Sequence, residues 1–278
     1  MKKIFSKKLK EKISQLAINN NKKDIITLLE NYLQDVKEIK IMTNEYFMLK
    51  FANWLKYGGK LPHKVFTIGN AKLPILSFSV LPGVTCPGAG SCLDYCYSFK
   101  AWRQPAPFFR QVQNTLLMVN DFNIIKSELI KEISRKKFND VAKIDFRLYV
   151  DGDFSNIKDL ENWMELLKDI PIINAYGYSK SLNLFLQLSD NQYKFPSNYV
   201  LNLSNGGIYD SLKQFLISLP FVRGNFTAVK IVKGENIRDN FKNKVFICPG
   251  NCGTCTKIGH ACGNMDTFNN MEIVIPVH

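Results

Sequence analysis

The chain has 278 residues, a hydrophobic fraction of 46% and a formal net charge of +13. This length suits one large α/β domain with a small appendage, and a domain of that size needs no disulfides for its stability. No apolar run approaches the roughly 18 residues that span a bilayer, and no signal-peptide core follows the basic N-terminus, so we expect a cytoplasmic protein without membrane contact.

Residues 1–60 are predicted to form a basic helical appendage. Apolar residues recur there at helical spacing, and Gly58 and Gly59 are expected to end the last helix. A solvated helical cap on the main domain is favoured over a dedicated DNA-binding unit. Nucleic acid stays open as a partner of the basic surface, because non-specific attraction to phosphate follows from net charge alone.

From Pro74 onward, short β-rich runs alternate with amphipathic helical stretches. This alternation predicts an α/β domain over residues 61–240, with a parallel sheet and crossover helices arranged as an open sheet or a partial or full (β/α) barrel. A Cys-rich metal-binding segment with a final strand is expected over 241–278. The expected strands are 75–80, 144–150, 172–178, 199–204, 227–232 and 272–277, and the expected helices are 109–119, 124–135, 157–167, 181–188 and 209–219.

Three cysteines, Cys86, Cys92 and Cys96, fall in a glycine-rich loop directly after the first expected strand. Gly88 and Gly90 allow close backbone approaches that a side chain would block. Three thiolates hold three irons of a cubane and leave the fourth iron open. Zinc would require a fourth protein ligand, for which only Asp94 lies nearby. The loop therefore predicts a [4Fe-4S] cluster with an open coordination site.

A second group of cysteines lies near the C-terminus. Four thiolates complete the shell of either Zn²⁺ or a cubane cluster, so this site is expected to be structural or an electron relay, and the spacing does not separate the two metals. His260 is expected beside the ligands or on the surface. The two groups use every cysteine of the chain, which leaves no thiol for a nucleophile, and a reducing compartment favours metal binding over disulfides. The four cysteines are Cys248, Cys252, Cys255 and Cys262.

Polar residues follow three successive expected strands. A turn with two carboxylates, such as the one at 151–153, can hold a cationic group or a metal, or can cap the next helix. Because the carboxyl ends of parallel strands share one rim with the cysteine loop, these turns together are typical of an active-site face. The candidate residues are Asp151, Gly152, Asp153, Ser179, Lys180 and Ser204.

These motifs resemble two families. The first strand, the three-cysteine loop with Tyr95 before Cys96, and the turn at 150–154 are similar to the radical-SAM superfamily, whose Gly-Gly-Glu-Pro turn receives the amino group of S-adenosylmethionine. The loop "TCPGAGxC...CY", the strand ends "GDF" and "YxKS" and the Cys-rich tail resemble more closely the uncharacterised phage and plasmid proteins of the gene-product-eighty-eight family, over residues 81 to about 263. That resemblance implies a bacteriophage or mobile-element origin and the cytoplasm of a host cell.

The radical-SAM resemblance implies a partial or full barrel whose open iron binds S-adenosylmethionine for reductive cleavage, with a reductant protein as partner. The turn at 151–153 would hold the ammonium group, and Ser179, Lys180 and Ser204 would contact the ribose or the substrate. The cysteine spacing of five and three residues departs from the usual three and two. The alternative is a non-catalytic iron-sulfur or zinc protein that binds nucleic acid or a host protein.

Overall fold

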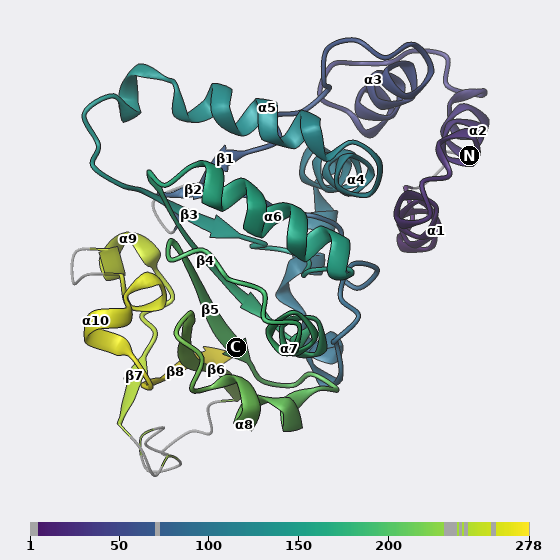
Figure 1. Ribbon diagram of the computed structural model, residues 1–278. Helices are drawn as coiled ribbons and strands as arrows, with labels where there is room; N and C mark the ends of the chain where they lie inside the picture. The colour runs from purple at the N-terminus through teal and green to yellow at the C-terminus, as the bar shows by residue number, and fades with distance from the viewer. Residues whose placement is uncertain are drawn as a thin grey trace.

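The computed structural model describes residues 5–69, 73–230, 238, 241, 244–256 and 260–277, and is built on one eight-stranded sheet (Figure 1). The strands lie in the order β1-β2-β3-β4-β5-β6-β8-β7, and all neighbours are parallel except β1 and β2. The strands are β1 (Thr67–Ile68), β2 (Leu76–Ser77), β3 (Ile144–Leu148), β4 (Ile173–Ser179), β5 (Tyr199–Ser204), β6 (Val222–Lys230), β7 (Val245–Ile247) and β8 (Glu272–Val277).

Helices connect the successive parallel strands from β2 to β6. Two helices lie between β2 and β3, and one helix lies in each of the next three crossovers, which confirms the predicted α/β architecture. Among the described residues the sheet has two edges, β1 and β7, and its likeness to a partial barrel stays a prediction. The crossover helices are α4 (Pro105–Asn120), α5 (Phe122–Ile133), α6 (Ile157–Asp169), α7 (Leu182–Asp190) and α8 (Lys213–Leu216).

Two expected elements are shorter than the sequence pattern predicted. The strand expected at 75–80 pairs as a strand only over β2, although the following residues stay hydrogen bonded to the chain beyond β3, as in Val80 N to Asp151 O at 3.0 Å. The helix expected at 209–219 is a 3-10 turn over Asp210–Leu212 followed by α8. Of the strand expected at 227–232, the last two residues lie outside the described residues.

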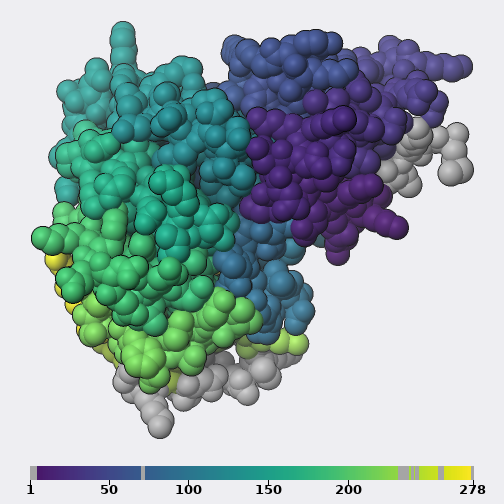
Figure 2. All heavy atoms as spheres, turned by 45° about the vertical axis from the view of Figure 1, so that its right-hand side comes forward, coloured from purple at the N-terminus to yellow at the C-terminus, as the bar shows by residue number. Residues whose placement is uncertain are grey.

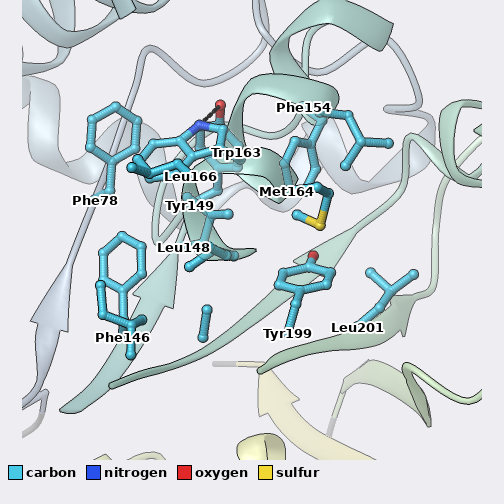
Figure 3. Packing of buried hydrophobic residues seen from close by; sticks show 14 of the residues in the cluster. Phe78, Phe146, Leu148, Tyr149, Phe154, Trp163, Met164, Leu166, Tyr199 and Leu201 are labelled. Atoms are coloured by element: carbon cyan, nitrogen blue, oxygen red, sulfur yellow. Dashed lines mark hydrogen bonds between the residues drawn. The ribbon is translucent and has the colours of Figure 1, made fainter. Parts of the chain in front are cut away.

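The main core fills the space between the sheet and the crossover helices (Figure 3). Trp163 of α6 is fully buried, and its Nε1 donates to Tyr149 Oη over 2.9 Å. Tyr149 Oη in turn donates to Asp159 Oδ1 over 2.6 Å. Tyr149 follows β3 directly and has a left-handed backbone with a φ of 55°. This buried network therefore holds the bend through which the chain leaves β3 for the 151–153 turn.

The N-terminal segment is helical, as predicted, with α1 (Lys7–Ile18), α2 (Lys22–Leu33) and α3 (Asn44–Tyr57). An apolar cluster joins these helices to α4, and includes Phe51 of α3 against Phe109 of α4 with ring centroids 5.1 Å apart. The helix α3 ends at Gly58, whose φ is 70°. Figure 2 shows the three helices standing beside the main body. Within the described ranges, no helix is long and apolar enough to cross a membrane.

The Cys-rich segment covers the face of the sheet opposite to α6 and α7 (Figure 1). It contains two short helices, α9 (Cys252–Thr256) and α10 (Met265–Phe268), and a 3-10 turn over Ala261–Gly263 between them. Apolar side chains of this segment, such as Ala261 and Phe268, pack in one cluster with Tyr176 of β4 and Val200 of β5. The two faces of the sheet are thus covered by different kinds of structure.

Candidate functional site

The first cysteine loop docks onto the turn that follows β5. Cys92 N donates to Gly206 O over 3.2 Å, and Ile208 N donates to Gly88 O over 3.0 Å. An isolated antiparallel bridge joins Ala89 to Gly207 between these bonds. The loop therefore lies on the carboxyl-end rim of the sheet, where the sequence pattern predicted it.

The glycines of the loop are required by contacts with the backbone of other strand ends. A Cβ atom at Gly88 would stand 2.0 Å from Lys180 O, and one at Gly90 would stand 2.9 Å from Gly206 O. Real Cβ atoms do not approach backbone oxygens so closely, so any side chain would push the loop away. The close approach predicted for these glycines is present, and the loop makes it to the backbone of Lys180 and Gly206.

Asp153 is the most heavily hydrogen-bonded of the candidate residues, and it is only 4% exposed. Its Oδ1 accepts from Phe154 N and Ser179 Oγ, both over 2.8 Å. Its Oδ2 accepts from Lys180 N over 2.8 Å and from Ser181 N over 3.2 Å. Four protein donors thus occupy the carboxylate. Asp153 ties the end of β3 to the end of β4, and an ammonium group would have to displace one of these donors.

Lys180 and Ser204 join the same cluster. Lys180 Nζ donates to Ser204 Oγ over 2.6 Å, which links the end of β4 to the end of β5. The structure therefore brings together four of the six candidate residues, namely Asp153, Ser179, Lys180 and Ser204. The lysine is partly exposed, whereas the two serines and the carboxylate are buried.

Asp151 and Gly152 face other partners. Asp151 Oδ2 accepts from Gln111 Nε2 of α4 over 3.0 Å, and burial raises the pKa of this carboxyl. Gly152 has a φ of 84°, and a Cβ there would stand 2.3 Å from Val80 Cγ2. This glycine is needed for the turn to pass beneath the start of the cysteine loop. Asp151 therefore belongs to the contact between the turn and α4.

All seven cysteines lie within the described residues, and none of them is in a disulfide. Burial, together with the negative charge of Asp153, raises the pKa of the Cys86 thiol to about 12. Burial likewise raises the pKa of the Cys262 thiol to about 12. Across the residues that the structure describes, no three His, Cys, Asp or Glu side chains stand close enough to share one metal ion. Metal binding at either group would draw the thiols together, and both predicted metal sites stay predictions.

In the second group, two thiols accept backbone hydrogen bonds from their own segment. Gly250 N donates to Cys248 Sγ and Ala261 N donates to Cys255 Sγ, each over 3.4 Å. Such bonds favour the charged thiolate over the neutral thiol. Burial nevertheless raises the pKa of both thiols, so these hydrogen bonds offset only part of the cost of charging them.

A buried pair that sequence reasoning missed anchors the second group to the sheet. Asn202 of β5 is fully buried, and its Nδ2 donates to Cys262 O over 2.9 Å. Arg223 of β6 is also fully buried, donates from Nε to Asn202 Oδ1, and donates from Nη1 to Phe268 O over 3.1 Å. The one sequence signal for this anchor was an arginine between apolar residues in a stretch that precedes an expected strand.

His260 lies in the interior, at 6% exposure, and its backbone N–H donates to Cys255 O over 3.0 Å, so of its two expected places the surface was wrong and the position beside the cysteines fits. Its ring stands edge-to-face against Tyr176 at 4.4 Å between centroids, and Nδ1 lies 3.4 Å from Asp145 Oδ2. Burial would raise the pKa of Asp145, but the nearby His260 ring and a hydrogen bond from Asn174 outweigh it and lower that pKa. The histidine thus packs between the Cys-rich segment and the sheet.

Comparison with known proteins gives one family. No curated protein and no solved structure matches the chain. Residues 49–267 match the family described as Gene product 88; the match covers more than half of the chain and includes the rim, both cysteine groups and the part of α3 from residue 49 onward. The chain therefore belongs to the Gene product 88 family.

Proposed function

We propose that this protein is an iron-sulfur protein in which Cys86, Cys92 and Cys96 hold a [4Fe-4S] cluster beside a small-molecule site on the carboxyl-end rim. The observation that carries the proposal is the docking of the cysteine loop onto the ends of β4 and β5 through Gly88 and Cys92. Three thiols in one loop suit a cubane that keeps one iron free for a ligand.

S-adenosylmethionine is the ligand that we propose for this site. When bound, such a cluster supplies an electron that cleaves the sulfonium of the cofactor. Lys180 and Ser204 are proposed to bind polar groups of the cofactor, and the position of their hydrogen bond, across two strand ends beside the loop, supports this role. The role of Asp153 is to position Ser179 and the backbone of Lys180, because its oxygens already accept four hydrogen bonds.

The second cysteine group is proposed to hold an auxiliary [4Fe-4S] cluster, with zinc as the alternative metal. Its four thiols offer a complete shell, and hydrogen bonds from Gly250 N and Ala261 N to two of them support the thiolate form. This group sits on the Cys-rich face, anchored by Asn202 and Arg223.

The test is anaerobic purification, analysis of iron, sulfide and zinc, and paramagnetic resonance of the reduced protein with and without S-adenosylmethionine. The proposal expects a spectral change on addition of the cofactor, followed by slow release of 5′-deoxyadenosine. Lys180→Met should weaken this response, whereas the exposed lysine variant Lys158→Met should not. A fully assembled cluster without any response would favour the non-catalytic metal protein, and zinc without sulfide would refute the cluster.

A further inference from the structure

A groove of about 790 Å³ lies between the N-terminal helices and the α4–α5 pair, away from the carboxyl-end rim. Its walls come from α2 and α3, from the segment 58–64, and from α4 and α5. Six cationic side chains line it, against two carboxylates, Asp121 and Glu128. The cationic residues are Lys22, Lys50, Lys60, Lys64, Lys131 and Arg135.

The cations of the groove differ in their partners. Lys131 pairs with Glu128 at 2.9 Å, and Arg135 pairs with Glu132 at 3.0 Å. The four lysines of the helical side, at positions 22, 50, 60 and 64, form no ion pair within the part of the chain that the structure describes. Their charges are therefore available to an anionic ligand.

The side chain of His63 is half-buried beside the basic residues of the groove. It lines the groove, and burial together with the charges of Lys50 and Arg110 lowers its pKa to about 4. The ring is therefore neutral near pH 7. Its backbone is fixed by Gln113 of α4, whose Oε1 accepts from His63 N over 2.9 Å and whose Nε2 donates to His63 O over 3.0 Å. The part of the groove lining that contains His63 is thus held in place before any ligand binds.

We propose that this groove binds the phosphate backbone of single-stranded nucleic acid. A concavity of this volume matches the size of a small-ligand site, and so admits a few nucleotides of one strand and excludes a duplex. Tyr57, next in the chain to the lining residue Gly58, is 80% exposed and offers a face on which a base can stack. The charge of +13 on the whole chain adds long-range attraction.

The experiment compares two variants of the full chain that lose the same number of positive charges. Both are purified anaerobically. The groove variant is Lys22→Gln, Lys50→Gln, Lys60→Gln and Lys64→Gln. The control variant changes four lysines outside the groove that are exposed and form no ion pair among the described residues, Lys12→Gln, Lys143→Gln, Lys158→Gln and Lys194→Gln. Binding of a labelled single strand of about 12 nucleotides is followed by fluorescence anisotropy, with a duplex of the same sequence as second probe.

We expect the groove variant to bind the single strand about ten-fold more weakly or worse. The slope of log affinity against log salt should fall by about 2 to 3, at about 0.7 for each phosphate that a lysine no longer neutralises. The control should bind within about three-fold of the unchanged protein. Equal weakening by both variants, or tighter binding of the duplex through the same lysines, would overturn the proposal. If the groove variant folds poorly, the unchanged protein provides a second test. The magnetic resonance signals of the His63 ring, assigned by their loss in His63→Gln, should shift when the single strand is added. Unchanged signals would also overturn the proposal.

Discussion

The guanidinium carbon of Arg147 lies 4.9 Å from the centroid of the Tyr178 ring, and its Nη2 donates to Tyr97 Oη over 3.3 Å. Tyr97 follows Cys96 directly in the chain, and the charge of Arg147 also acts on the thiol of Cys262. Arg147 on β3 therefore stands between the two cysteine groups, although these groups are far apart in the sequence. Arg147 therefore links the proposed site on the rim to the proposed site on the Cys-rich face.

Each cysteine group nevertheless keeps its own thiols, so we expect the proposed clusters to assemble separately. The double variant Cys92→Ala and Cys96→Ala should retain about four irons per chain, against about eight for two cubanes. Iron and acid-labile sulfide analysis measures this directly. Loss of all iron from a protein with an unchanged circular dichroism spectrum would show that the groups form one shared site.

Replacing Arg147 should lower the reduction potentials of both proposed clusters. A nearby cation stabilises the more negative, reduced form of a cluster, so Arg147→Met is expected to shift each midpoint by several tens of millivolts to more negative values. Arg147→Lys keeps the charge and should shift them less. A redox titration followed by paramagnetic resonance gives the values, and a shift at one cluster alone would mean that the arginine serves a single site.

Tyr149→Phe should destabilise the fold by about 2 to 4 kcal/mol. The change removes the hydroxyl that accepts from Trp163 and donates to Asp159, and leaves both partners buried without it. Tyr199→Phe is the matched control, because the equally buried Tyr199 hydroxyl has no hydrogen-bond partner in the described part of the chain. Urea unfolding of both variants measures the loss in the free energy of unfolding. An equal loss in the two variants would show that the Trp163–Tyr149–Asp159 hydrogen bonds do not stabilise the fold.

The stability of the protein should fall as pH rises from about 4 to 7. Burial raises the pKa of Asp159 in the folded protein from 3.8 to about 7, so the folded state takes up a proton that the unfolded state releases in this window. At 1.36 kcal/mol per pKa unit the loss is about 4 kcal/mol or less. Asp159→Asn should flatten this part of the profile, measured by urea unfolding across pH. A profile with the same slope in the variant would place the proton uptake elsewhere.

Gly88→Ala should loosen the cysteine loop, because the added Cβ meets Lys180 O at 2.0 Å. In metal-free protein the alkylation of Cys86 is expected to become several-fold faster, since its thiol is held neutral by burial in the docked loop. Gly263→Ala is the control, as its Cβ would meet only side-chain atoms at 3.4 Å or beyond. Unchanged labelling of Cys86 in the Gly88 variant would mean that the loop adapts without leaving the rim.

Periodicity was enough to predict the long elements and the rim. Apolar spacing predicted α1, α3 and α6, and the alternation of strands with helices predicted parallel pairing, which in turn placed Asp153, Ser179 and Ser204 together. Short elements escaped detection, because β1, β7 and α10 are each too short to show a repeating pattern. Their pairing depends on contacts made only in the folded chain.

The sequence pattern did not predict that the Cys-rich segment covers the face of the sheet opposite to α6 and α7. Cysteine spacing predicted a group at 248–262, but not that Asn202 binds the backbone of Cys262 or that Arg223 binds the backbone of Phe268. A buried arginine is stable only when its donors find acceptors, and three of the four acceptors of Arg223 are distant in sequence. The same reason hid the partners of His260, which lie on β3 and β4.

The bridge between Ala89 and Gly207 also sets an order of events during synthesis. The cysteine loop leaves the ribosome roughly ten seconds before the turn on which it docks, at a usual elongation rate. Until then Cys86, Cys92 and Cys96 belong to an unfinished polypeptide whose thiols have no fixed mutual arrangement. A factor that delivers metal to this loop would therefore find the docked loop only after β5 has been translated, so maturation of the site is expected late in synthesis or after it.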